Sequence, residues 1–249
     1  MVDTSLNKIH SALIVGGASG IGLAIAVLLA SRETTNRVFV VDKNPFPEPY
    51  RHPKIESKVF DLRTEDYSFF DQFTIVDTLM ITAGFGKLAH FHDLTEQYII
   101  DSFQVNTLPV LRLVKRFYPR LESPEPFQCG VMVSIAGFLS SPLFSVYGST
   151  KAALRSFIES VNVELTKAGS RNRILNVSPG FIKGTGFYQK ATDISVTKDL
   201  ALEIITHLEA HDDLFIPDYE SVYQEVLERY HADFRKEGLH SYDYKLSRM

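Results

Sequence analysis

The chain lacks several features that mark particular classes of protein. It has one cysteine, Cys129, among 249 residues, so no disulfide can form within the chain, which fits a reducing compartment. Charge of neither sign dominates, because 26 basic and 30 acidic residues give a formal net charge of -4. No basic stripe stands out that could neutralise a run of phosphates. We therefore expect no nucleic-acid partner.

One uncharged segment could be mistaken for a membrane span. Residues 12–30 carry no charge, and they follow Lys8 much as a signal or membrane anchor would. Its middle, Gly16 to Gly22, is so rich in glycine that it would weaken a spanning helix, whereas it suits a sharp turn between two short buried elements. We therefore expect a cytoplasmic, soluble protein with no membrane partner.

The composition that remains, 45% hydrophobic and 22% charged, is that of a globular protein with a sizeable core. Short β-branched and aliphatic runs alternate with longer segments of helical period, which is typical of a parallel sheet covered on both faces. Right-handed crossovers then predict an α/β fold, a Rossmann-like doubly wound parallel sheet. The expected strands are Ala12–Val15, Arg37–Val41, Lys58–Phe60, Thr78–Thr82, Gly130–Ser134, Ile174–Val177 and Leu214–Ile216. The expected helices are Ile21–Ser31, Leu94–Tyr118, Val146–Ala168 and Lys198–Ala210.

We expect a single domain over residues 1–249. The proline-rich stretch Pro45–Pro53 is interpreted as a surface loop, because strand and helix signals resume on both sides of it. A C-terminal helical extension is expected at about 217–249, since apolar and aromatic residues recur there at steps of three and four. We expect this stripe to cover the domain body, with a subunit contact as the alternative. Its members are Tyr219, Val222, Tyr223, Val226, Tyr230 and Phe234.

A glycine-rich turn follows the first expected strand, in the order strand, turn and helix that a dinucleotide site needs. Glycine lets the backbone approach a pyrophosphate, and a helix starting near Gly20 aims its free N–H groups at that anion. The spacing Gly-x3-Gly-x-Gly alone is a weak signal, and a structural turn is the rival interpretation. No Gly-Lys-Ser/Thr ending follows, which disfavours a nucleoside triphosphate loop.

Asp42 ends the second expected strand, about 20 residues past the glycines, as in dinucleotide-binding folds. A carboxylate there can accept hydrogen bonds from both ribose hydroxyls of adenosine and would repel a 2'-phosphate. No Lys or Arg lies within Gly16 to Gly22 to offset that repulsion. The sequence therefore favours NAD, although Lys43 keeps NADP as an alternative. An ordinary turn acid is the other interpretation of Asp42.

Tyr147 and Lys151 are four residues apart at the start of a helical segment, so they share one face. A fixed ammonium favours the phenolate and would lower the pKa of the phenol toward a value useful near neutral pH. Ser134 ends an apolar strand, where its hydroxyl can hold a carbonyl oxygen beyond the strand tip. Chance spacing is the alternative, since Tyr50 and Lys54 show it in the proline-rich loop.

With these motifs the sequence resembles the short-chain dehydrogenases and reductases, in their compact branch of about 250 residues. The resemblance extends to about Phe215. It implies Ser134, Tyr147 and Lys151 in catalysis, and Asn106 as the residue that holds a water linking the lysine to solvent. It also implies cofactor contacts at Gly16, Ser19, Gly20, Ile21, Gly22, Asp42, Asp61, Leu62, Ala83, Gly84, Tyr147, Lys151, Pro179, Gly180 and Ile182.

Asn106 has one further argument from the sequence. Pro109 lacks an N–H group, so the expected helix Leu94–Tyr118 should kink next to Asn106. Pro109 explains a kink without any function, so a plain helix-surface asparagine is the alternative.

The sequence departs from the pattern of the family at Val15, where a threonine is usual, at Pro217-Asp218 in place of a glycine-rich ending, and at two further positions. Thr82 replaces the asparagine of Asn-Ala-Gly, which we expect to loosen the link between the glycine turn and the central strands. After Pro179-Gly180 the usual threonine falls one place late, at Thr185, which leaves its diphosphate contact in doubt. None of these changes removes an acid, a base or a residue of the hydride path.

We therefore expect an enzyme that interconverts an alcohol and a ketone or aldehyde with NAD(H), with Tyr147 as general acid and base. We expect no metal site, and assembly into a homodimer or homotetramer. The alternative is a catalytically idle NAD-binding sensor or interaction module. A small apolar alcohol or carbonyl compound is the expected substrate, because apolar side chains follow the strands, although a core role is equally open to them. These are Phe85, Ile135, Phe138, Phe144, Phe181 and Phe187.

Overall fold

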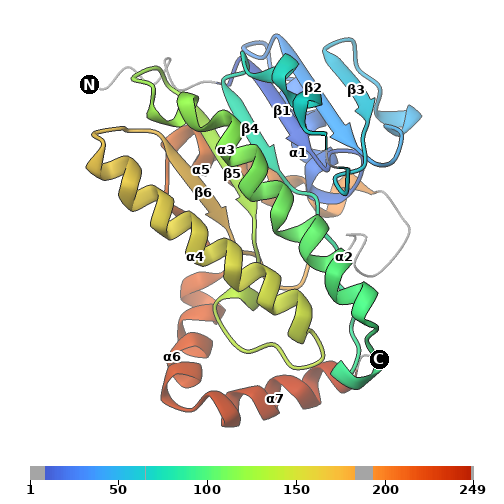
Figure 1. Cartoon of the computed structure of the whole chain (residues 1–249), viewed down its shortest axis with the longest axis vertical. Coiled ribbons are helices and arrows are strands. Elements are labelled where there is room, and N and C mark those ends of the chain that lie inside the picture. Colours follow the sequence, from blue (N-terminus) through green and yellow to red (C-terminus); the bar gives the residue numbers. More distant parts are fainter. Residues whose placement is uncertain (1–8, 65, 183–192, 248–249) are drawn as a thin grey trace.

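The computed structural model describes residues 9–64, 66–182 and 193–247. Seven strands form one parallel sheet in the order β3-β2-β1-β4-β5-β6-β7 (Figure 1). The prediction of a doubly wound α/β sheet is confirmed, and the strand order reverses between β1 and β4. The strands are β1 Ser11–Val15, β2 Arg37–Asp42, β3 Ile55–Val59, β4 Thr78–Ile81, β5 Gln128–Met132, β6 Arg173–Val177 and β7 Leu214–Phe215.

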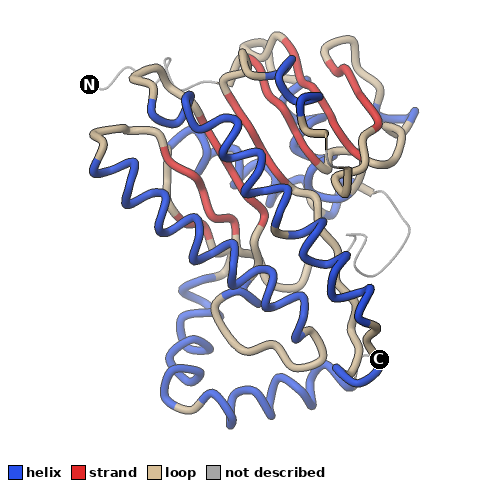
Figure 2. The backbone as a smooth tube through the Cα atoms, viewed as in Figure 1, coloured by secondary structure: helices blue, strands red, loops and turns tan. Residues whose placement is uncertain are grey.

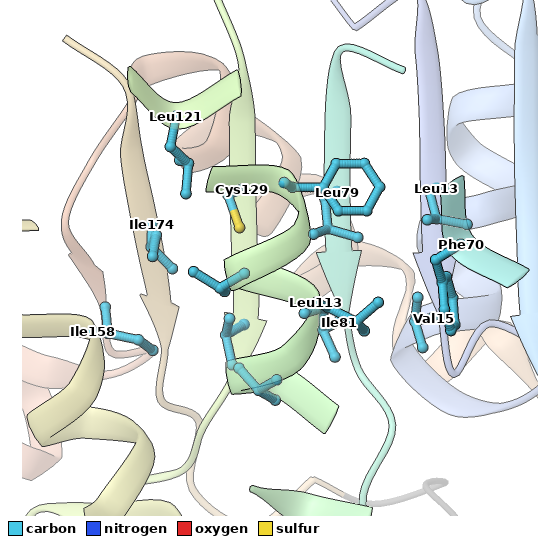
Figure 3. Packing of buried hydrophobic residues seen from close by; sticks show 14 of the residues in the cluster. Leu13, Val15, Phe70, Leu79, Ile81, Leu113, Leu121, Cys129, Ile158 and Ile174 are labelled. Carbon is cyan, nitrogen blue, oxygen red and sulfur yellow. The ribbon is translucent and has the colours of Figure 1, made fainter. Parts of the chain in front are cut away.

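Helices cover both faces of this sheet (Figure 2). On one face, α1 (Gly20–Ala30) and α5 (Lys198–Ala210) bury a cluster that includes Ile14 of β1. On the other face, α3 (Leu108–Glu122) and α4 (Ser145–Lys167) pack on β4, β5 and β6. Figure 3 shows this second core, whose side chains alternate with those of the first along each strand. Among the described helices, none is both long and apolar enough to cross a membrane.

The long helix expected over Leu94–Tyr118 is two helices. α2 (Glu96–Asn106) ends where Thr107 takes φ -116° and ψ -61°, and α3 starts at the next residue. Pro109 cannot donate a backbone hydrogen bond to the turn before it, which explains the break. The predicted kink next to Asn106 is confirmed.

The C-terminal extension expected at about 217–249 is helical, but it is not one continuous helix. It forms one π-helical turn, Tyr219–Tyr223, then α6 (Gln224–Ala232) and a further helix α7 (Phe234–Leu246). Asp233 separates the two helices, because its backbone is extended and its carboxylate accepts hydrogen bonds from the N–H groups that begin α7. Both helices lie beyond the carboxyl ends of the strands, where a doubly wound fold binds its ligands (Figure 1).

Candidate functional site

A cavity of about 680 Å³ lies at the carboxyl ends of the central strands, where the strand order reverses. Doubly wound sheets bind ligands at this position. The structure brings together here most residues that the sequence singled out for cofactor binding and catalysis. They are Gly16, Ser19, Gly20, Ile21, Gly22, Asp42, Asp61, Leu62, Ala83, Gly84, Ser134, Tyr147, Pro179, Gly180 and Ile182.

The glycine turn can hold an anion. Gly16 has φ +93°, and a β-carbon there would lie 2.4 Å from the backbone nitrogen of Ala83, so the position requires glycine. α1 begins at Gly20 without a capping bond from the Ser19 side chain and without an acidic residue in its first turn. Its first N–H groups are therefore left to a ligand, and these features fit the pyrophosphate of a dinucleotide.

Thr82 tightens this turn. Its hydroxyl donates a hydrogen bond to the carbonyl oxygen of Gly16 at 2.9 Å and lies 3.2 Å from that of Val15. The expectation that threonine loosens the link between the turn and the central strands is wrong, because the short side chain reaches the same backbone directly.

Asp42 stands at the end of β2 with both carboxylate oxygens in use. One accepts the N–H of Ala18 at 3.0 Å, and the other accepts the N–H of Asn44 at 2.9 Å. Each oxygen keeps a further lone pair, so ribose hydroxyls remain acceptable donors. The carboxylate thus lies against the glycine turn, in the same cavity.

Two cations share this end of the cavity, Lys43 and Arg63. Arg63 forms an ion pair with Asp61, with Nη2 to Oδ2 at 2.6 Å. Hydrogen bonds from Arg63 lower the pKa of Asp61 to about 2. Arg63 was not among the residues expected from the sequence; its position two residues after Asp61, an expected cofactor contact, is the signal that could have found it.

Ser134 and Tyr147 meet on the cavity wall. Ser134 follows β5, its hydroxyl accepts the N–H of Ala136 at 3.1 Å, and it also hydrogen-bonds the phenol of Tyr147 in the first turn of α4. Burial raises the pKa of Tyr147 to about 12, and the bond to Ser134 opposes this rise. The phenol is therefore protonated at neutral pH.

Lys151 lies one turn further along α4 and is 2% exposed. Its Nζ donates a hydrogen bond to the carbonyl of Met132 at 2.8 Å and lies 5.6 Å from the ring centre of Tyr147. Burial lowers the pKa of this ammonium to about 7. The expected lowering of the phenol's pKa by Lys151 is not found, because burial disfavours the charged form of both groups.

Asn106 is fully buried, which excludes a surface role. Its Oδ1 accepts the N–H of Phe85 at 2.9 Å, and its Nδ2 donates to the carbonyl of Phe85 at 2.8 Å and contacts Thr150 Oγ1 at 3.2 Å. A β-carbon at Gly84 would lie 3.3 Å from Asn106 Oδ1 and 3.4 Å from Lys151 Nζ. Asn106 and Lys151 therefore stand directly behind the cavity wall, and Asn106 fixes the loop after β4.

The residues expected to line a substrate pocket divide into two groups. Phe85, Phe144 and Phe181 line the cavity, whereas Ile135 and Phe138 do not. Residues 135–137 form a 3-10 turn that presents Ala136 instead, and the ring of Phe138 lies under the guanidinium of Arg155. Phe187 and Thr185 lie outside the described residues.

Two cavity residues come from the C-terminal helix α7, Tyr244 and Lys245. The sequence analysis expected a helical stripe over the domain but did not extend it to these residues. No local pattern marks them, because their approach to the cavity depends on the turn at Asp233.

Known proteins share this architecture. Residues 10–194 match the family model of the short chain dehydrogenases. The chain belongs to the short-chain dehydrogenase family. The resemblance inferred from the motifs is thereby confirmed, and the chain is an oxidoreductase of this family with its nucleotide-binding fold.

Two curated relatives of this short-chain dehydrogenase are 30% identical to it. One is an uncharacterised short-chain type dehydrogenase/reductase of Sinorhizobium fredii, similar over 189 residues that cover 75% of each chain. The other, a probable NADP-dependent dehydrogenase of Haemophilus influenzae, is similar over 194 residues, which cover 72% of this chain and 74% of that protein.

Solved structures share the fold of the short-chain dehydrogenase at lower identity. A short chain dehydrogenase from Burkholderia cenocepacia in complex with NADP has a TM-score of 0.77 at 17% identity, over 94% of this chain and 98% of that one. One from Streptomyces avermitilis has a TM-score of 0.72 at 20% identity, over 97% and 98%. The family match ends at residue 194, so α7 lies beyond it.

Proposed function

We propose that this short-chain dehydrogenase interconverts an alcohol and a ketone or aldehyde with NAD(H), using Tyr147 as general acid and base. One observation carries the proposal: the hydroxyls of Ser134 and Tyr147 are hydrogen-bonded on the cavity wall, with Lys151 buried directly behind. A carbonyl oxygen placed between the two hydroxyls can accept a hydrogen bond from each.

A nicotinamide dinucleotide in this cavity would supply or accept the hydride. The N–H groups at the start of α1 would hold its pyrophosphate, and Asp42 would accept its adenosine ribose hydroxyls. Lys151 uses one ammonium proton on Met132, and its other two are available to the nicotinamide ribose. Pro179, Gly180 and Ile182 would line the nicotinamide end.

The preference for NAD over NADP rests on charge. The Asp42 carboxylate would repel a 2'-phosphate, and the guanidinium of Arg63 is already paired with Asp61. The relative from Haemophilus influenzae is named as NADP-dependent, so this preference is specific to the residues of this chain.

The protonation states suit carbonyl reduction. With its pKa raised to about 12, Tyr147 carries the proton that it donates to the carbonyl oxygen as the hydride arrives at carbon. Ser134 stabilises the negative charge that develops on that oxygen. Lys151 is near the ring, and in its ammonium form it stabilises the resulting phenolate. In oxidation the same groups act in reverse, and Asn106 is a positioning residue for the loop beside them.

The test is the Tyr147→Phe variant, which removes the acid and keeps the ring. Wild type should oxidise NADH with at least one member of a panel of aldehydes and ketones. The variant should lose on the order of a thousandfold in kcat, because a positioned acid contributes that much. Its affinity for NADH, measured by fluorescence titration, should change by less than about twofold.

Two results would overturn this proposal. Turnover retained by Tyr147→Phe would remove the phenol from the chemistry. Tight NADH binding without turnover of any carbonyl compound, in wild type, would favour the catalytically idle NAD-binding sensor instead.

A further inference from the structure

The substrate end of the cavity carries a cation that the proposed chemistry does not use. Lys245 of α7 lines the cavity together with Tyr147. Its Nζ lies 5.7 Å from the ring centre of Phe144, and that ring lies 5.6 Å from the ring centre of Tyr147. The ring of Phe144 is therefore a shared neighbour of this ammonium and of the proposed catalytic phenol.

The ammonium of Lys245 is held in place and has donor capacity left. Its Nζ donates hydrogen bonds to Ser141 Oγ at 2.7 Å and to the carbonyl of Pro142 at 3.1 Å. An ammonium has three donors, so one N–H remains. Both partners are neutral oxygens, which orient the group without neutralising its charge.

No carboxylate of the described residues forms an ion pair with Lys245. The three acidic residues that line the cavity, among those described, belong to its other end: Asp42 lies against the glycine turn, Asp61 binds Arg63, and Asp101 interacts with the same guanidinium. Residues 183–192, which follow the cavity residue Ile182, contain no Asp or Glu. The cavity thus carries an unneutralised cation beside Phe144, and partial burial of the Lys245 ammonium lowers its pKa to about 8.

The backbone that carries Lys245 is fixed against the rest of the protein. The Arg229 guanidinium binds the carboxylate of Glu237 at 2.8 Å across the corner between α6 and α7, and Glu237 is 9% exposed. A β-carbon on Gly238 would lie 3.4 Å from Ser140 Oγ, so α7 runs close against the loop that joins β5 to α4 (Figure 1). Because the backbone is fixed and two hydrogen bonds already hold the ammonium, Lys245 loses little side-chain entropy when it binds a ligand.

We propose that Lys245 binds a carboxylate of the substrate, so that the enzyme acts on an oxo acid or hydroxy acid whose apolar body lies against Phe144. The reactive oxygen would lie at Ser134 and Tyr147, and the carboxylate at the remaining N–H of Lys245. This inference rests on the proposed function, since it assigns the far end of the same substrate. It replaces the neutral apolar substrate expected from the aromatic residues alone.

The test compares two ligands of the same shape that differ in charge, 4-acetylbenzoate and 4-acetylbenzamide. Calorimetric titration of the full chain, alone and with NADH, should show the acid binding about tenfold more tightly than the amide, which is the effect of one charge-assisted hydrogen bond. Added salt should weaken the acid alone.

Lys245→Met keeps the apolar stem and removes the charge, so it should weaken the acid about tenfold and leave the amide unchanged. Lys245→Arg should restore most of the preference. Lys236→Met, which removes an exposed charge from the same helix, is the matched control and should behave as wild type. A selective loss of affinity for the acid separates this role from a structural one, because loosening of α7 would lower the affinity for both ligands alike.

The inference is overturned if wild type binds the two ligands equally or binds neither. It is also overturned if Lys245→Met weakens both ligands equally or keeps the preference for the acid. These titrations need no turnover. If the acid preference is absent but Tyr147→Phe loses activity, the oxidoreductase proposal stands and the acid site does not. If Lys245→Met loses the acid selectively but Tyr147→Phe keeps its activity, the acid site stands and the oxidoreductase proposal does not.

Discussion

The phenol of Tyr223 lies directly over the backbone of Gly180. A β-carbon at Gly180 would be 1.6 Å from the hydroxyl oxygen of Tyr223 and 2.6 Å from its Cζ, closer than atoms can approach. Tyr223 belongs to the π-helical turn that leads into α6, and Gly180 lines the cavity at the turn after β6. The C-terminal helices are therefore in contact with the cavity wall at a position where any larger residue would displace the ring of Tyr223.

This contact predicts that Gly180→Ala lowers the free energy of unfolding by about 1–3 kcal/mol, the usual cost of overpacking. The ring of Tyr223 must move, which should also make the chain after Ile216 easier to cleave. Urea denaturation and limited proteolysis measure the two effects. In a Tyr223→Ala background the same substitution should cost much less, whereas simple additivity of the two changes would disprove the contact.

Thr82→Val should loosen the glycine turn. The substitution removes the hydroxyl that donates to the Gly16 carbonyl while keeping the shape of the side chain. We expect a loss of about 1 kcal/mol in the free energy of unfolding, together with weaker NADH binding, because the turn is less fixed. Denaturation and NADH titration measure both quantities. Thr82→Ser keeps the hydroxyl and should match wild type in stability and NADH affinity. If Thr82→Val also matches wild type in both, the hydrogen bond contributes nothing.

Asp42→Asn should shift the cofactor preference. It removes the negative charge that would repel a 2'-phosphate and retains one carbonyl oxygen as acceptor for the N–H of Ala18. The ratio of kcat/KM for NADPH to that for NADH should rise about tenfold or more, which kinetics with both cofactors would show. Glu56→Gln, at an exposed acid of the neighbouring strand β3, is the control. An unchanged ratio in Asp42→Asn would refute the role of its charge.

The buried Lys151 predicts a pH dependence of stability. Burial lowers its pKa from 10.5 to about 7, so above that pH the unfolded chain binds more protons than the folded protein. The free energy of unfolding must therefore rise between about pH 7 and pH 9, and below that range Lys151 is charged in both states and contributes no slope.

Denaturation of wild type, Lys151→Met and the control Lys236→Met across this pH range tests the effect. The difference in unfolding free energy between wild type and Lys151→Met should grow with pH. Unfolded Cys129, with an ordinary pKa of 9.0, ionises toward the upper end of this range, but it does so in all three proteins and cancels in the difference. A difference that stays constant would mean that Lys151 is protonated to the same extent in both states.

Much of the fold follows from local patterns. The alternation of buried strands and amphipathic helices predicted the parallel sheet, and Pro109 predicted the break after Asn106, because both effects depend on neighbouring residues. The C-terminal helix was predicted without its break, since capping by Asp233 competes with a continuous apolar stripe.

Side-chain environments were harder to predict. The spacing of Tyr147 and Lys151 places them together. It does not show that burial raises the pKa of the phenol and lowers the pKa of the ammonium. Thr82 departs from the family pattern, yet only the approach of the Gly16 backbone shows that its hydroxyl still bonds there.

The sequence by itself determined the sheet, the glycine turn at the start of α1 and the grouping of Ser134 with Tyr147, because these depend on periodicity and on short spacings at strand ends. Only the tertiary structure decided that Lys245 reaches the cavity that holds Tyr147. The two residues are far apart in the chain and no local pattern links them; the turn at Asp233 and the packing of α7 on the loop after β5 bring them together.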